Sequence, residues 1–152
     1  MPNIIIRIPA DVLDAGPRQR LVESVVAAAA AAEQIPDNPK NRFLCWTIVE
    51  QVAAAHWALG GQDVTSSCIP ILMQVFVPAG VLNAAGRAVY AEGMHQAAVG
   101  ALSTEKRRIL TSSIFHEVDD GTWAVDGRRW HLPDFARHAG YAHLHHLVNK
   151  KA

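Results

Sequence analysis

TIVEQVAAAHWALGG at residues 47–61 and SIFHEVDDGTWAVDG at residues 113–127 align without a gap, at a spacing of 66 positions. Five of the 15 aligned residues are identical, and both stretches end in a Trp followed by a glycine turn. The segments in front of them agree as well, because IPADVLDA at 8–15 resembles VPAGVLNA at 77–84. We interpret this agreement as one structural unit that occurs twice in the chain.

The two copies span about 2–61 and 70–132, and the spacing of 69 in their first parts indicates a three-residue difference in loop length. A repeated unit of this length cannot bury its apolar face alone. The chain has 152 residues, and 50% of them are hydrophobic. This length and composition predict one domain over residues 1–135 that holds both copies. Residues 136–152 are expected to form a C-terminal tail or an interface helix.

Composition and charge narrow the class of protein. Lys plus Arg equals Asp plus Glu at 14 each, so no basic surface indicates nucleic acid or an anionic membrane as a partner. The two cysteines, Cys45 and Cys68, have neither disulfide-framework nor zinc-ligand spacing. The start lacks a signal-peptide pattern and Val25–Ala32 is too short to span a bilayer, so we expect a cytoplasmic protein.

The first copy reads as a strand, a helix and a second strand. Asn3–Ile8 is mostly β-branched, Pro17–Gln34 is alanine-rich with a periodic apolar face, and Phe43–Val49 returns to strand composition. A helix between two strands implies a parallel crossover. Each copy is therefore expected to be a βαβ unit.

The second copy repeats this order with a strand at Ile71–Val77, a helix at Ala84–Leu102 and a strand at Ile109–Phe115. Asp126-Gly127 then suits a two-residue hairpin turn, as Gly60-Gly61 does in the first copy. The sequence predicts an α+β fold of two fused β-α-β-hairpin units with pseudo-twofold symmetry. Its four-stranded mixed sheet carries two helices on one face, and the uncovered face is expected to pack against neighbouring subunits.

A strand that begins directly after Met1, the βαβ order and HWALGG at 56–61 together resemble the tautomerase superfamily. The resemblance covers residues 2 to about 135. It implies that Met1 is removed and that the amine of Pro2 is the catalytic base or nucleophile, without a metal or organic cofactor. It also implies a small-molecule substrate and, for a chain with two fused units, a homotrimer.

The physical chemistry of Pro2 agrees with such a role. An α-amino group ordinarily titrates near 7.7–8.0, and apolar surroundings lower that value because they disfavour the charged form. A neutral secondary amine can act as a general base or add to a carbonyl. If Met1 is retained, the nitrogen is an inert tertiary amide.

Several residues are candidates for holding the substrate. Arg18 corresponds to the family's carboxylate-binding arginine near the start of the first helix, and guanidinium groups suit bidentate carboxylate recognition. The family's arginine on the second strand is replaced by Trp46, so Arg42 is a candidate substitute. Trp57 and Trp123 occupy the family's active-site aromatic position in their respective copies and can wall the proline pocket.

His116 and Glu117 are the acid/base candidates in the second copy, and strand alternation predicts that they face opposite sides of the sheet. The histidine-rich tail lacks carboxylates at metal-ligand spacing, so no metal site is predicted; a terminal helix over Asp134–Val148 is expected instead.

We expect a cofactor-independent tautomerase or isomerase acting on a small keto/enol carboxylate. Three alternatives stay open at this point. The first is a decarboxylase or dehalogenase of the same superfamily, and the second is a non-catalytic binding protein with the same fold, which the missing arginines favour. The third is a dimeric ferredoxin-like barrel that holds a ligand or haem against its sheet.

Overall fold

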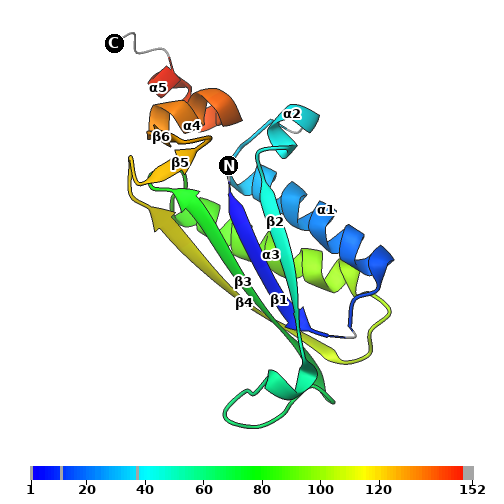
Figure 1. Ribbon diagram of the computed structural model, residues 1–152. Helices are drawn as coiled ribbons and strands as arrows, with labels where there is room; N and C mark the ends of the chain where they lie inside the picture. Colours follow the sequence, from blue (N-terminus) through cyan, green and yellow to red (C-terminus); the bar gives the residue numbers. More distant parts are fainter. Residues whose placement is uncertain (1, 11, 37, 149–152) are drawn as a thin grey trace.

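The computed structural model describes residues 2–10, 12–36 and 38–148 (Figure 1). Its strands are β1 (Asn3–Pro9), β2 (Trp46–Val52), β3 (Cys68–Pro78), β4 (Arg108–Val118), β5 (Trp123–Val125) and β6 (Arg128–Trp130). Its helices are α1 (Ala15–Ala32), α2 (Pro39–Arg42), α3 (Ala84–Ala101), α4 (Leu132–Ala139) and α5 (His145–Val148), with 3-10 turns at Ala54–His56 and Ala142–Leu144. Met1, whose removal the sequence analysis invokes, lies outside the described residues.

The four long strands form one mixed sheet in the order β2-β1-β3-β4. Strand β1 pairs parallel with β2, β3 pairs parallel with β4, and the two units meet along the antiparallel pair β1 and β3. Figure 1 shows α1 and α3 side by side on one face of the sheet. The predicted α+β fold with two helices on one face of a four-stranded mixed sheet is confirmed.

This strand order excludes the ferredoxin-like alternative. In a split βαβ arrangement another strand lies between the two parallel strands of each unit. Here the parallel partners are direct neighbours in both units.

Alternation of side chains along the strands produces the core. Ile4, Ile6 and Ile8 of β1 are buried against the helices, while the residues between them are only half-buried. Strand β3 continues the same layer with Ile69, Ile71, Met73, Val75 and Val77. These two central strands therefore supply the floor on which both helices pack.

The two long helices pack closely because small residues line their contact. A Cβ atom added at Gly93 of α3 would lie 2.9 Å from the Cβ atom of Ala28 on α1. Real side chains do not approach this closely, so only glycine permits the observed separation of the helices.

Two predicted elements differ in their bounds. Strand β2 begins at Trp46 instead of Phe43, because the short helix α2 occupies the segment before it, with the Asn38 side chain accepting from the Asn41 N–H. The predicted terminal helix over Asp134–Val148 is wrong in its continuity, since Gly140 takes a left-handed conformation (φ 70°) and ends α4.

The predicted second hairpin is confirmed. Strands β5 and β6 pair around Asp126 and Gly127, whose φ angles of 49° and 75° are those of a two-residue turn with left-handed residues. In the first unit the corresponding segment forms only a single bridge, between Leu59 and Gln62.

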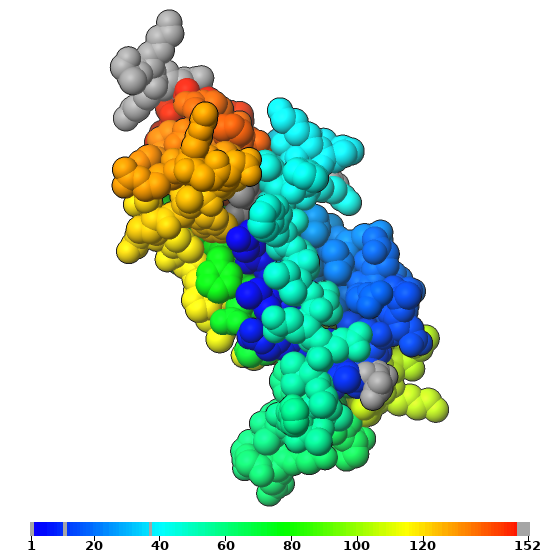
Figure 2. Space-filling view, viewed as in Figure 1, coloured from blue at the N-terminus to red at the C-terminus, as the bar shows by residue number. Residues whose placement is uncertain are grey.

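The sheet face opposite the helices carries large apolar side chains and a row of polar ones. Trp46, Ile48 and Ile114 have exposed fractions of 63%, 56% and 44%. Between them the Arg7 guanidinium lies 2.6 Å from the Glu50 carboxylate and donates to the Gln74 side chain at 2.7 Å. Figure 2 views this face, with β2, β1, β3 and β4 lying next to one another across it.

Candidate functional site

The start of the described chain lies at the end of the sheet where β2 begins and β3 ends. Pro2 is buried, and its carbonyl accepts a hydrogen bond from the Trp46 N–H at 3.1 Å. The next residue, Asn3, is paired with Trp46 on one side and with Phe76 on the other. Pro2 is thereby held by two strands at a defined place.

Two hollows adjoin this position. The first has a volume of about 130 Å³ and is lined by Asn3, Trp46, Trp123, Ala124, Val125 and Asp126. The second has a volume of about 290 Å³ and is lined by Asn3, Ile4, Ile5, Trp46, Ile48 and Phe76. Asn3 and Trp46 border both hollows, so the residue that follows Pro2 is also a wall of each.

The first hollow has the more polar wall of the two. The amide oxygen of Asn3 is buried and accepts no hydrogen bond from the described residues. The Asp126 carboxyl group belongs to the first hollow, at the turn of the β5–β6 hairpin. A buried acceptor without a donor is costly, which favours a ligand group that donates to it.

Trp123 is placed by the second hairpin. Its ring packs at 5.4 Å from the ring of Phe135 on α4, and Trp130 packs on the other side of Phe135 at 5.1 Å. This aromatic cluster fixes the hairpin over the start of β1. Of the two tryptophans predicted to wall a proline pocket, Trp123 is therefore the one that lines a hollow beside Pro2 in the same chain.

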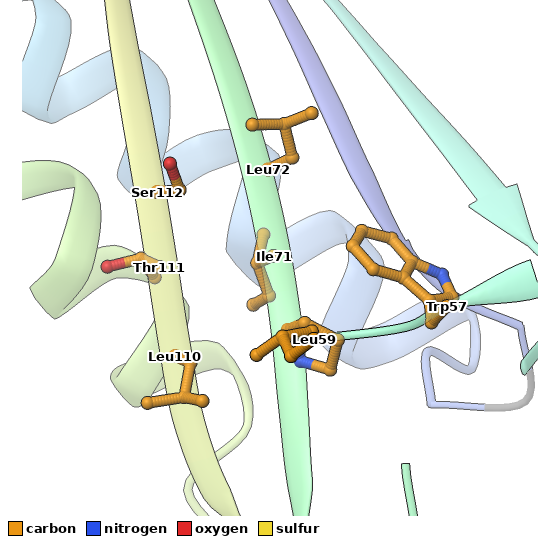
Figure 3. A pocket seen from close by; sticks show the side chains of 8 residues that line it. Trp57, Leu59, Ile71, Leu72, Leu110, Thr111 and Ser112 are labelled. Atoms are coloured by element: carbon orange, nitrogen blue, oxygen red, sulfur yellow. The ribbon is translucent and has the colours of Figure 1, made fainter. Parts of the chain in front are cut away.

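Trp57 lies at the opposite end of the sheet. It borders a hollow of about 350 Å³ together with Leu59, Pro70, Ile71, Leu72, Leu110, Thr111 and Ser112 (Figure 3). Its indole Nε1 is buried without a hydrogen-bond partner among the described residues. Within one chain, the structure does not bring Trp57 together with Pro2.

The two candidate arginines are also separated. Arg42 belongs to α2, which directly precedes the start of β2 and lies at the Pro2 end of the sheet (Figure 1). Arg18 is in the first turn of α1, at the other end. Both side chains are exposed.

His116 and Glu117 face opposite sides of β4, as alternation predicts. The His116 ring stacks on Phe76 at 4.5 Å, on the open face next to the second hollow. Glu117 instead forms an ion pair of 2.8 Å with Arg87 of α3 on the helix side. Only His116 is placed on the face that carries the hollows.

The sequence reasoning missed Glu33, which is buried with an exposed fraction of 0% just after α1. Its carboxylate accepts hydrogen bonds from the hydroxyls of Tyr90 and Tyr141, each at 3.2 Å. The signal was available, because Glu33 continues the buried four-residue spacing of Leu21, Val25 and Ala29.

Nearby titratable groups reflect this buried charge. Burial raises the pKa of the Cys45 thiol to about 11, and the charge of Glu33 adds to the effect. Burial, followed by the charge of Glu33, raises the pKa of both the Tyr90 and Tyr141 hydroxyls well above the ordinary value. The two tyrosines therefore stay protonated and serve as donors.

Among the described residues there is no group of three or more His, Cys, Asp or Glu side chains arranged to hold a metal ion. No helix in the described part of the chain is long and apolar enough to cross a membrane.

No protein-family model and no curated protein sequence matches the chain. Its structure, in contrast, is similar to several solved ones. N1, a member of the cis-3-chloroacrylic acid dehalogenase family, superimposes with a TM-score of 0.70 at 13% identity, over 89% of this chain and 87% of that one. R7, a fused 4-OT asymmetric trimer, superimposes with a TM-score of 0.67 at 12% identity, over 84% of this chain and 94% of that one.

A third similar structure is the macrophage migration inhibitory factor of Toxoplasma gondii, with a TM-score of 0.63 at 17% identity, over 84% of this chain and 99% of that one. Together these likenesses show that the chain has the fold of the tautomerase superfamily. Its two βαβ units in one polypeptide correspond to the fused arrangement seen in R7.

Proposed function

We propose that this protein is a cofactor-independent tautomerase that acts on a small keto/enol carboxylate, with the amine of Pro2 as its general base after removal of Met1. The observation that carries the proposal is the position of Pro2. It is buried at the start of β1 and fixed by Trp46, and the hollows beside it are lined mainly by apolar and aromatic side chains.

Each step of the reaction has a candidate group. A neutral Pro2 nitrogen takes a proton from the carbon next to the substrate carbonyl and returns it to the other position of the enolate. Trp46 and Trp123 restrict the access of water to this nitrogen. His116, on the open face beside Phe76, is the acid/base candidate for the enol oxygen, whereas the ion pair of Glu117 with Arg87 favours a structural role.

The candidate groups at the far end of the sheet require a neighbouring subunit. Arg18 and Trp57 lie away from Pro2 within one chain, and the open face presents exposed Trp46, Ile48 and Ile114. Association of copies through this face would bury those side chains. The fused 4-OT structures with the same fold are trimers, which supports a homotrimer here. In such a trimer Arg18 or Trp57 of one subunit would complete the site of another subunit. Arg42 would contribute to the site of its own chain.

We place the protein in the cytoplasm.

The test is ketonisation of phenylpyruvate enol by the native protein and by Pro2→Ala, with Pro70→Ala, a proline of β3 in the other unit, as the control. Because general base catalysis contributes about 10²–10⁴-fold, Pro2→Ala is expected to lose activity on that order. Pro70 is an internal imide without a free amine, so its variant should retain activity. Equal rates for native protein and Pro2→Ala, or no activity in either, would reject the catalytic role and leave a binding role.

A further inference from the structure

The buried carboxylate of Glu33 takes no part in the mechanism above. It follows the last turn of α1 and is held by hydroxyls from two distant segments, Tyr90 on α3 and Tyr141 just before the second 3-10 turn. The charge of this carboxylate contributes to the raised pKa of the Cys45 thiol and of the two tyrosine hydroxyls.

The buried carboxylate lies in the region where β1 starts. Cys45 directly precedes Trp46, whose N–H donates to the Pro2 carbonyl, and the Cys45 thiol is close enough to Glu33 to be influenced by its charge. Pro2 itself is buried. Figure 1 shows the end of α1 beside the first strand, behind the sheet. The carboxylate and the residue that would carry the amine therefore share one buried region.

We propose that Glu33 is the buried counter-ion of the amino group that Pro2 carries once Met1 is removed. A buried carboxylate is stabilised by a positive charge within reach, and a secondary ammonium supplies that charge together with two N–H donors. This inference rests on the proposed function only in taking Pro2 as the mature amino terminus. Glu33 is thereby a positioning residue, because it acts on the substrate only through the amine.

The consequence concerns the protonation state of Pro2. Burial alone favours the neutral amine, whereas a carboxylate within about 4–6 Å favours the cation. The second effect exceeds the first only when the ion pair is close and its remaining polar atoms are hydrogen-bonded, and the proposal assigns that arrangement to Glu33 and the Pro2 amine. The amine is then a cation at neutral pH, and the base form, with the activity that needs it, increases as the pH rises.

Several other titratable groups lie around Glu33. Tyr90, Tyr141 and Cys45 all have raised pKa values and are neutral near pH 7. The ring of His143 lies 6.0 Å from that of Tyr141, and its Nε2 is 2.9 Å from the Val81 carbonyl. The exposed Arg42 of α2 carries a charge that does not change over this range. A His143→Gln variant therefore serves as the control for histidine titration.

The experiment is a pH titration of protein labelled with [¹⁵N]proline, in the absence of substrate, after mass spectrometry has shown that Met1 is gone. Of the eight prolines, only an amino-terminal one titrates, so its ¹⁵N shift reports the amine directly. Glu33→Gln is expected to lower the midpoint by about 1–3 pH units. Glu23→Gln removes the same charge from an exposed position of α1 and should leave the midpoint unchanged.

Two results would overturn the inference: an unchanged midpoint in folded Glu33→Gln, or a native midpoint below the ordinary α-amino range of about 7.7–8.0. The second criterion uses native protein alone and applies even when Glu33→Gln does not fold. A chain that keeps Met1 in its host overturns both proposals. Otherwise the two are separable, because ketonisation by Pro2→Ala tests the enzyme and the titration tests the counter-ion.

Discussion

The two ends of the sheet are built from corresponding parts and differ in chemistry. At one end the hollow beside Pro2 is bordered by Asn3, Trp46 and the second-unit Trp123. At the other end the corresponding hollow is bordered by Leu72, Ser112 and the first-unit Trp57. Each hollow is thus closed by the tryptophan of the opposite unit.

This difference teaches that duplication repeats a framework without repeating a site. The pseudo-twofold axis brings Ile71 of β3 to the place that corresponds to Pro2, but a residue inside the chain has no amine. Among the described residues, only the first end has a buried carboxylate, because Glu33 follows α1 whereas Leu102 follows α3.

The largest effect is expected from blocking the amine. A chain that carries one additional, uncleaved residue in front of Pro2 has a tertiary amide at that position. Ketonisation should fall by about 10²–10⁴-fold, while the same residue added at the C-terminus should have no effect. Full activity of the blocked chain would exclude Pro2 as the base. The two ends of the sheet would then not differ by a catalytic amine.

The next effect concerns the contact between the two units. Gly93→Ala should lower the free energy of unfolding by about 1–3 kcal/mol, because the new methyl group would lie 2.9 Å from the Ala28 Cβ atom and force α1 and α3 apart. Gly100→Ala, on the same helix with open space around it, should instead raise it by up to about 1 kcal/mol. Urea denaturation of both variants measures the difference; a destabilisation of Gly100→Ala equal to that of Gly93→Ala would show that the close contact with Ala28 is not the cause.

A smaller effect is expected when the first end is made to resemble the second. Trp46→Ser introduces the residue found at position 112 and removes an aromatic wall from both hollows. A loss of about 1 kcal/mol of aromatic contact corresponds to a roughly fivefold lower kcat/KM. Ile114→Ser changes an exposed apolar residue of the same sheet face that lines neither hollow, and serves as control. An equal loss in both variants would indicate damage to subunit association.

A pH dependence is also expected at the buried region beside Pro2. The pKa of Cys45 is near 9 in the unfolded chain and about 11 in the folded one. Between these values the folded state binds more protons, so the free energy of unfolding should decrease as the pH rises from 9 to 11. Because the pKa values of Tyr90 and Tyr141 are also raised by folding, these tyrosines should likewise lower the free energy of unfolding at high pH.

The free energy of unfolding of Cys45→Ala should decrease less steeply between pH 9 and 11 than that of the native protein. Denaturation at a series of pH values measures this difference. An identical slope in native protein and variant would show that the thiol does not contribute. Alkylation of Cys45 at pH 8 should also be about 100-fold slower than for a thiol of ordinary pKa, because the thiolate is the reactive form.

Much of the fold was predictable because its signals are local. The β-branched run at Asn3–Ile8, the alanine-rich helix and the Asp126-Gly127 turn each specify an element by composition. The internal repeat supported this assignment, because it indicates the same order of elements in both copies. The start of β2 was misplaced because Phe43 has strand propensity, whereas the Asn38 cap and Pro39 favour a helical turn in front of it.

The site was predicted only in part. Pro2, Trp46 and Trp123 were named from the sequence; Trp46 and Trp123 line one hollow together, and the Trp46 N–H donates to the carbonyl of Pro2. Glu33 was missed because it closes a run of alanines that reads as helix, and burial of its carboxylate depends on Tyr90 and Tyr141, which lie 57 and 108 positions away in sequence.

The sequence was sufficient for the two units and their order, because periodicity and turn residues act over a few positions, and it drew attention to the proline at position 2. Only the tertiary structure decided which tryptophan lies beside that proline. It also decided that His116 stacks on Phe76 while Glu117 pairs with Arg87, and that a carboxylate is buried behind the first strand. These facts depend on strand register and on contacts between distant segments, which no local pattern encodes.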